Sequence, residues 1–284
     1  MALRTNKELL DHAKANGYAV GAFNVNNLEQ VIAVLETAEE EKAPVIIAIT
    51  EGAIKYAGET FFFKAAPVMA ADAKIPASVH LDHGGKFANI VKCVKGGFSS
   101  VMFDGSSLPF EENAGMTKKV VEVAHPVGIS VEGEIGHVGG KEGGVDGGND
   151  EILTDPAEAK RFAEETGVDS LAVAVGTVHG MRTQTAKLDL GRISAISSVV
   201  AVPLVLHGAS GVPDEVFDEV IARGIHKINI GTELQKSFST AMRQFAGDNP
   251  KIIDIRKLFR PAIDGMKESV RTKIRLFKSN GKAW

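Results

Sequence analysis

Three histidines in this sequence stand where they can share one metal ion. His83, His179 and His207 each follow a short run of Val, Ile, Leu and Ala residues that is typical of a buried strand. If these strands are parallel, their carboxyl ends meet on one rim, and three imidazoles can converge on a divalent cation with one coordination position left open. A single histidine is more often packed than ligating, but three at strand ends favour a catalytic metal site.

Carboxylates stand beside these histidines. Asp82 adjoins His83, and it can ligate the cation, orient its neighbour or transfer a proton. Glu132 and Glu134 share one face of another strand, and Asp104 ends a third. This acidic group can hold a second cation, or it can form a polar interior paired with Lys or Arg. For four other histidines we expect packing or hydrogen-bonding roles instead of ligation: His12, His80, His125 and His226. His137, which opens a glycine-rich segment, could also approach the metal.

Two segments near the end of the pattern suit a phosphate group. Residues 207–211 (HGASG) combine glycines, whose backbone N–H groups can approach an anion, with the hydroxyl of Ser210. Residues 229–232 (NIGT) run from a strand directly into a predicted helix near Thr232. In a barrel enzyme these two loops form the usual phosphate site.

Eight strand-like runs must position these residues, and each is followed by a stretch with helical spacing. The expected strands are residues 19–25, 44–50, 77–82, 99–104, 128–135, 170–177, 203–207 and 225–230, and helices are expected at 27–41, 110–124, 155–166 and 214–223. Eight such units predict an α/β fold, a closed (β/α)8 TIM barrel in place of an open doubly wound sheet. The pattern of residues 250–284 predicts one or two extra C-terminal helices. We expect a single domain over residues 1–284.

A glycine-rich segment interrupts the pattern at residues 137–151. It holds six glycines and is too long for an ordinary connection. We expect a mobile functional loop without helix or strand.

The composition limits the possible partners. With 44% hydrophobic residues and a net charge of −4 without a basic block, the chain can bury a core and is not expected to bind nucleic acid. The single Cys93 lies in an apolar run and predicts a buried helical thiol in a reducing compartment. No apolar run reaches about 18 residues, and the N-terminus lacks a signal-peptide pattern, so we expect a cytoplasmic protein without a membrane segment.

Seven segments together resemble the class II (zinc-dependent) fructose- and tagatose-bisphosphate aldolases in order and spacing. They are residues 18–27 (YAVGAFNVNN), 78–84 (SVHLDHG), 99–110 (SSVMFDGSSLPF), 132–140 (EGEIGHVGG), 171–180 (LAVAVGTVHG), 203–211 (PLVLHGASG) and 227–234 (KINIGTEL). The resemblance implies reversible cleavage of a ketohexose 1,6-bisphosphate to dihydroxyacetone phosphate and glyceraldehyde 3-phosphate through a zinc-stabilised enediolate. It also implies a homodimer or homotetramer.

The resemblance further implies a role for each matching position. His83, His179 and His207 would bind zinc, Asp82 would exchange the proton of the C4 hydroxyl, and Glu142 would exchange the C3 proton. Asp104 and Glu134 match an alternate metal position. The substrate phosphate and a monovalent cation, Na⁺ or K⁺, would lie at Gly140, Gly180, Gly208, Ser210, Asn229, Gly231 and Thr232. The rest of the sugar would meet Asn24 and Thr50.

The sequence departs from the family pattern at two places. After His179 and Gly180 the family usually has a Tyr-Lys pair, whereas this chain has Met-Arg-Thr at 181–183. Arg182 is expected to replace the phosphate-binding lysine, although its guanidinium has a different reach. The glycine-rich segment lacks a second acidic residue next to Glu142, so the C3 role depends on Glu142 alone.

The same residues leave other chemistries open. Lys227, the one lysine well inside an expected strand, could instead form a Schiff base with the substrate. A metal-dependent barrel hydrolase commonly has paired histidines on the first strand, where this chain has Asn24, Val25 and Asn26. A sugar-phosphate binding protein that has lost catalysis would not need Asp82 and Glu142. The sequence does not choose between fructose and tagatose bisphosphates, which differ only at C4.

Overall fold

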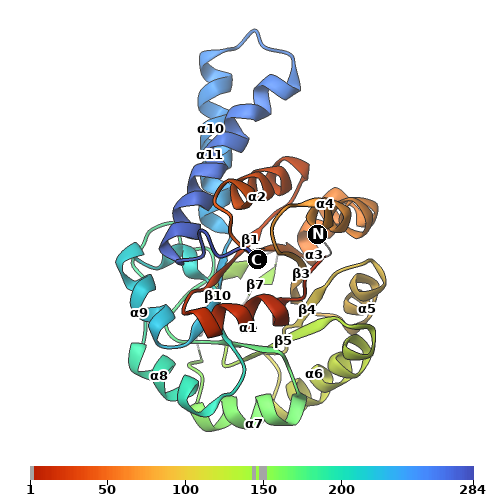
Figure 1. The fold of residues 1–284 in the computed structure, drawn as a ribbon, viewed down its shortest axis with the longest axis vertical. Helices are drawn as coiled ribbons and strands as arrows, with labels where there is room; N and C mark the ends of the chain where they lie inside the picture. The colour runs from red at the N-terminus through yellow and green to blue at the C-terminus, as the bar shows by residue number, and fades with distance from the viewer. Residues whose placement is uncertain (1–2, 143–144, 147–151) are drawn as a thin grey trace.

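The eight predicted strands form a closed parallel barrel, which confirms the predicted fold class (Figure 1). The computed structural model describes residues 3–142, 145–146 and 152–284. Around the barrel the strands follow the order β1, β10, β9, β8, β5, β4, β3, β2. Their bounds are β1 (Val20–Asn24), β2 (Val45–Thr50), β3 (Ala77–Gly84), β4 (Ser100–Phe103), β5 (Ser130–Ile135), β8 (Ser170–Val173), β9 (Leu204–Leu206) and β10 (Ile225–Ile230).

The strands are buried on both faces, which is why they read as continuous apolar runs. All six residues of β2 are buried, and β2 pairs in parallel register with β3 from Val45 opposite Ala77 to Thr50 opposite Asp82. The strand β8 ends earlier than predicted. Its continuation at Ala174 donates to the Thr154 hydroxyl instead of to a neighbouring strand, so the ladder stops there.

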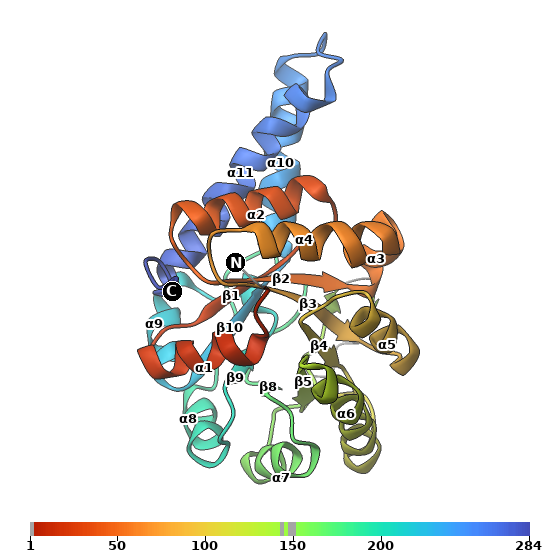
Figure 2. The same cartoon turned by 45° about the vertical axis from the view of Figure 1, so that its right-hand side comes forward.

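The helices surround the barrel (Figures 1 and 2). The α-helices are α1 (Asn6–Asn16), α2 (Leu28–Glu40), α3 (Glu51–Ala57), α4 (Ala66–Asp72), α5 (Phe87–Lys95), α6 (Phe110–Ala124), α7 (Pro156–Thr166), α8 (Leu190–Val199), α9 (Phe217–Ala222), α10 (Thr232–Asp248) and α11 (Ile255–Leu276). Short turns of other helix types are η1 (Phe61–Ala65), η2 (His125–Val127), η3 (Ala209–Gly211) and η4 (Asp214–Val216). Among the described residues, none of these helices has both the length and the apolar character that a membrane crossing requires.

Helix α1 lies across the amino-terminal end of the barrel. It begins with a capping box between Thr5 and Glu8, which satisfies two free N–H groups of the first turn. The Asn6 backbone N–H donates to Ser130 Oγ at the start of β5 (3.0 Å), so the helix start is fixed to the barrel. The carboxyl ends of the strands therefore form the opposite rim.

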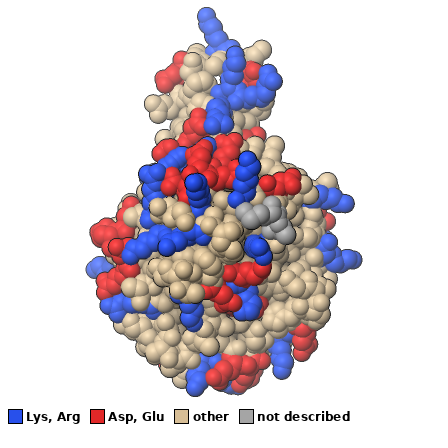
Figure 3. All heavy atoms as spheres, in the orientation of Figure 1, with Lys and Arg blue, Asp and Glu red and all other residues tan. Residues whose placement is uncertain are grey.

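The chain ends in a helical hairpin that projects from the barrel (Figures 1 and 2). It pairs α11, the one helix within the predicted C-terminal extension, with α10, which follows β10. Lys267 of α11 donates to Glu36 (2.8 Å) and Glu40 (2.6 Å) of α2. Figure 3 shows the acidic and basic side chains gathered at the base of the hairpin. Ion pairs therefore attach the hairpin to the barrel wall.

The glycine-rich segment corrects one prediction. It was expected to hold neither strand nor helix, but β6 (Lys141–Glu142) pairs antiparallel with β7 (Val145–Asp146). An isolated bridge between His137 and Ile152 joins the two ends of the segment. The expected mobility concerns residues that include 143–144 and 147–151, which lie outside the described part.

Candidate active site

The three predicted histidines meet on the carboxyl-end rim of the barrel. His83 lies in β3, His207 directly follows β9, and His179 lies in the segment after β8. The ring centroids are 4.9 Å apart for His83 and His179, 4.6 Å for His83 and His207, and 5.9 Å for His179 and His207. One nitrogen of each ring lies within 4.8 Å of the others. The rings are thus close enough to share one cation.

The backbone at His83 adopts a conformation that few side chains tolerate. Its φ of 50° lies in the left-handed region, where a residue other than glycine is held only by its surroundings. The following glycine, Gly84, lies against the carbonyl of Met102 with no room for a side chain. The next N–H, of Gly85, donates to the Glu51 carboxylate (3.1 Å). These contacts fix the direction in which the His83 ring points.

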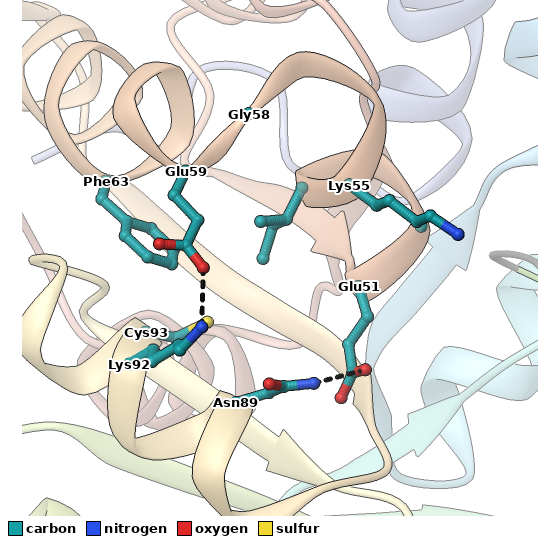
Figure 4. A pocket seen from close by; sticks show the side chains of 10 residues that line it. Glu51, Lys55, Gly58, Glu59, Phe63, Asn89, Lys92 and Cys93 are labelled. Atoms are coloured by element: carbon teal, nitrogen blue, oxygen red, sulfur yellow. Dashed lines mark hydrogen bonds and ion pairs between the residues drawn. The ribbon is translucent and has the colours of Figure 1, made fainter.

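Glu51 also belongs to a separate cavity of about 640 Å³ between α3 and α5 (Figure 4). Its second carboxylate oxygen accepts from Asn89 (2.8 Å), and an ion pair joins Glu59 and Lys92 nearby (2.9 Å). The thiol of Cys93 is buried in α5, as predicted, and burial raises its pKa to about 12. The three histidines are not among the residues that line this cavity, and Glu51 connects its lining to the rim by accepting from the Gly85 N–H.

His179 is positioned by the beginning of the glycine-rich segment. Its backbone N–H donates to the Gly139 carbonyl (2.8 Å), and Gly140 forms a parallel bridge with it. Gly140 has a φ of 99°, and a Cβ at this position would collide with the His179 backbone. A glycine is therefore required here for His179 to reach the other two histidines.

Two carboxylates decide which nitrogens face the shared point. His83 Nδ1 lies 2.8 Å from Asp104 Oδ2, and His207 Nε2 lies 2.9 Å from Glu132 Oε1. An ionised carboxylate only accepts hydrogen bonds, so each of these ring nitrogens carries a proton. In a neutral ring the other nitrogen carries the lone pair, and these two remaining nitrogens, His83 Nε2 and His207 Nδ1, are 3.0 Å apart.

That arrangement fits a metal ion. Two lone pairs facing each other repel unless a proton or a cation lies between them. Two imidazole nitrogens on one tetrahedral zinc ion would be roughly 3.3 Å apart, given bonds of about 2.0–2.1 Å. The distance of 3.0 Å between His83 Nε2 and His207 Nδ1 is close to this value. The donor set therefore suits a cation that binds neutral imidazole.

The carboxylates behind the rings are held ionised. Burial by itself would raise the pKa of Asp104, but hydrogen bonds from His83 and Ser106 hold that pKa well below its usual range. Burial would also raise the pKa of Glu132, and here the Lys227 ammonium and the bond from His207 outweigh it. Both groups therefore remain hydrogen-bond acceptors at neutral pH.

Asp82 is fully buried beside the histidines and is held by two amides. Asn24 Nδ2 donates to one carboxylate oxygen (2.7 Å) and Asn229 Nδ2 to the other (3.0 Å). Burial would raise the pKa of Asp82, but electrostatic interactions with His83, His207 and the Lys227 ammonium lower it well below its usual range. Asp82 Oδ1 lies 4.0 Å from His207 Nδ1. The result is an ionised carboxylate in a fixed orientation next to the three imidazoles.

His83, Asp104 and Glu134 form a second group with ligand atoms within 4.8 Å of one another. Burial, followed by the negative charge of Asp104, raises the pKa of Glu134 to about 8. Within the described residues its Oε2 atom is buried without a hydrogen-bond partner. A proton or a second cation can neutralise this carboxyl group, so the group fits the alternate metal position that the sequence suggested.

The predicted phosphate residues lie on adjoining loops. Gly208 has a φ of 64° and leaves its Cβ position about 3.1 Å from the Val178 backbone, so the loops after β9 and β8 touch. Ser210 Oγ accepts from the backbone N–H of Glu233 (3.3 Å) at the start of α10. The structure therefore places the following residues along one side of the rim: Gly140, Gly180, Gly208, Ser210, Gly231 and Thr232.

The remaining predicted residues differ in how they are placed. Thr50 lies opposite Asp82 in the sheet, and its hydroxyl accepts from Ala53 N–H (3.1 Å) as the N-cap of α3. Arg182 is exposed in the segment that follows Gly180. The side chain of Glu142 lies outside the described part of the chain.

Sequence reasoning missed one connected set. Ser106 Oγ donates to Asp104 (2.8 Å) and lies 2.9 Å from His137 Nδ1, so the start of the glycine-rich segment is linked to the Asp104 and His83 pair. The available signal was the serine two residues after an aspartate, a spacing typical of an Asx turn. The remaining histidines have the packing roles predicted for them: His80 bonds Ser100, His12 stacks on Trp284, His125 pairs with Asp169 and His226 bonds the Tyr18 carbonyl.

A closed (β/α)8 barrel with three converging imidazoles on its carboxyl-end rim defines a barrel enzyme whose site can hold a cation. The chain belongs to the class II fructose-bisphosphate aldolase family, because the sequence model of that family matches residues 4–282. It is accordingly an aldolase, a carbon–carbon lyase, and this class has a metal-dependent chemistry that the histidine-rich site suits.

Individual relatives agree with this assignment. The chain is 43% identical to a fructose-bisphosphate aldolase from Thermus caldophilus, over 99% of this chain and all of that protein. Among solved structures, the YdjI aldolase from Escherichia coli K12 is 37% identical with a TM-score of 0.88, covering 99% of this chain and all of that one. A putative fructose-1,6-bisphosphate aldolase from Coccidioides immitis is 32% identical with a TM-score of 0.90, covering 97% and 96% of the two chains.

Proposed function

We propose that this aldolase reversibly cleaves a ketohexose 1,6-bisphosphate, fructose or tagatose, between C3 and C4 with zinc as its cofactor. The products are dihydroxyacetone phosphate and glyceraldehyde 3-phosphate. The observation that carries the proposal is the buried, ionised Asp82 beside three imidazoles whose nitrogens converge on one point. The names of the relatives from Thermus caldophilus and Coccidioides immitis support a fructose bisphosphate substrate.

His83, His179 and His207 would hold the cation, and a set of three neutral imidazoles with an open position is typical of catalytic zinc. A bound zinc ion acts as a Lewis acid that stabilises the negative charge developing on the substrate when the carbon–carbon bond breaks. The protein contributes the orientation of the rings, which Asp104 and Glu132 fix through hydrogen bonds.

Asp82 is the group that takes the proton of the C4 hydroxyl in the cleavage direction. Its two oxygens are oriented by Asn24 and Asn229, and each of these amides has a buried Oδ1 atom without a partner among the described residues. Those two acceptors can bind hydroxyl groups of the sugar. A positioned proton transfer of this kind contributes about 10²- to 10⁴-fold to the rate.

The remaining roles are proposed from the positions at which the sequence matches the aldolase family. Glu142 returns a proton to C3, so that dihydroxyacetone phosphate leaves. Backbone N–H groups on the loops around Gly208 and Gly231, with the Ser210 hydroxyl, receive the C1 phosphate together with a monovalent cation, and Arg182 adds positive charge. We also propose a homodimer or homotetramer.

Steady-state cleavage of both bisphosphates, with metal-free protein and after added zinc, tests the function. Release of triose phosphate is followed in a coupled assay. We expect negligible turnover without metal, recovery with zinc, and a preference for one of the two sugars. Zinc-independent turnover with substrate trapped on Lys227 by borohydride would overturn the proposal in favour of a Schiff base.

A further inference from the structure

Lys227 is a lysine that the proposed reaction does not use. It lies in the middle of β10, is fully buried, and points into the barrel beneath the histidines. Its ammonium donates to both carboxylate oxygens of Glu132, at 2.9 and 2.8 Å. Burying two charges is costly even when they are paired, so the pair needs an explanation beyond stability.

A second contact of Glu132 explains why the buried ion pair is present. The same oxygen that accepts from Lys227, Oε1, also lies 2.9 Å from His207 Nε2. The opposite nitrogen of that ring, Nδ1, faces His83 Nε2 at the point where a cation would be shared. Glu132 therefore connects a buried positive charge to one metal-facing imidazole.

We propose that Lys227 and Glu132 act as a positioning pair that fixes His207 in the tautomer with its lone pair on Nδ1, ready to bind the metal. This inference rests on the proposed metal-dependent function. The ammonium keeps Glu132 an acceptor, the acceptor keeps the proton on Nε2, and Nδ1 is left free for a cation. Without the pair, the neutral ring could carry its proton on either nitrogen.

The neighbouring His80 is consistent with this assignment of protons. It is fully buried, and burial together with the charge of Lys227 lowers its pKa to about 3, so it is neutral. Its Nδ1 lies 2.9 Å from Ser100 Oγ, and its Nε2 lies 3.4 Å from Lys227 Nζ. A neutral His80 with its proton on Nδ1 donates to Ser100 and accepts from the lysine. Each group in the cluster then has a compatible partner.

The test compares four variants with the wild-type protein. Lys227→Met removes the charge, Glu132→Gln allows the side chain either to donate to or to accept from His207, and the double variant removes both charges so that neither is left unpaired. Lys273→Met is the matched control, because Lys273 is equally buried and ion-paired, with Asp214 (2.7 Å) and Glu233 (3.0 Å), but lies in α11 away from the histidines.

Zinc affinity is measured on metal-free, folded protein by competition with a chromogenic chelator, with folding checked by circular dichroism. We expect Glu132→Gln and the double variant to bind zinc about 10- to 100-fold more weakly than wild type, the usual effect of removing a partner of a metal-binding histidine. Lys227→Met should weaken binding too, and Lys273→Met should leave affinity unchanged. If Lys227→Met does not fold, the double variant carries the test.

The tautomer itself is read from two-bond ¹H–¹⁵N spectra of histidine-labelled, metal-free protein. We expect His207 to carry its proton on Nε2 in wild type and in Lys273→Met, and to show a mixture in Glu132→Gln. Unchanged zinc affinity and an unchanged tautomer in every folded variant would show that the pair is only structural. A wild-type protein that binds no zinc would instead remove the proposed function on which the inference rests.

Discussion

Replacing Asp82 with asparagine separates its proposed role from that of the metal site. The substitution keeps the shape of the side chain but removes the proton acceptor, so cleavage should fall about 10²- to 10⁴-fold. At about 1.4 kcal/mol for each factor of ten, this equals roughly 3–5.5 kcal/mol of lost transition-state stabilisation. Metal binding should persist, because Asp82 is not one of the three converging ligands.

The same substitution also has a predictable effect on stability. Both oxygens of Asp82 accept from amides, of Asn24 and Asn229, so an Asn at position 82 places one donor against another. A buried donor without an acceptor costs about 1–3 kcal/mol. Chemical denaturation of metal-free protein should show a loss of this size, and Asp82→Ala should show a loss as well, because it leaves both amides without an acceptor.

A half-reaction makes the assay decisive. Dihydroxyacetone phosphate has no C4, so exchange of its C3 proton with deuterated water does not need Asp82. We expect Asp82→Asn to lose cleavage yet retain this exchange and its zinc, whereas Glu142→Gln should lose both reactions and retain zinc. Wild-type cleavage in Asp82→Asn, or loss of its zinc together with both reactions, would refute the reasoning.

Three further predictions concern the scaffold. Gly140→Ala should weaken zinc binding, measured by chelator competition, because a Cβ at this left-handed position displaces the His179 backbone. Thr154→Val should lower the free energy of unfolding by about 1–3 kcal/mol in urea titrations, because it removes the buried hydroxyl that joins two strand ends. The hydrogen bond from Lys267 lowers the pKa of Glu40, so its stabilisation is present above the unfolded pKa of about 4.3 and is lost as pH falls below it. Lys267→Met should therefore flatten the decline of the melting temperature below about pH 5, and an unchanged decline would contradict this assignment.

The sequence predicted the barrel strands well because a parallel strand covered on both faces must be apolar along its length. Helix α6 was predicted with its observed bounds for a similar reason, its apolar positions recurring at helical spacing. The early end of β8 could not be predicted, because it depends on Thr154, a residue 20 positions away that takes over the bonding of Ala174. The hairpin of β6 and β7 is too short for any periodic signal.

The candidate site also has features that the sequence predicted and features that it could not predict. Polar residues at the ends of apolar strands can be recognised from the local sequence, which is why His83, His207 and Asp82 were predicted as site residues. Their protonation was not visible, since it depends on contacts such as Lys227 with Glu132, which are 95 positions apart in the chain. The place of Lys227 in a strand is compatible with a nucleophile, and only its buried contacts indicate the different role proposed for it.

The distribution of the three imidazoles along the chain links metal binding to folding. His83 and His207 are 124 positions apart, yet their facing nitrogens are 3.0 Å from each other. That proximity exists only after the strands between them have closed the wall of the barrel, so an unfinished or opened chain offers no site of comparable affinity. A cation bound here would therefore stabilise the folded protein relative to the unfolded chain. Retention of the cation would indicate that the barrel is closed.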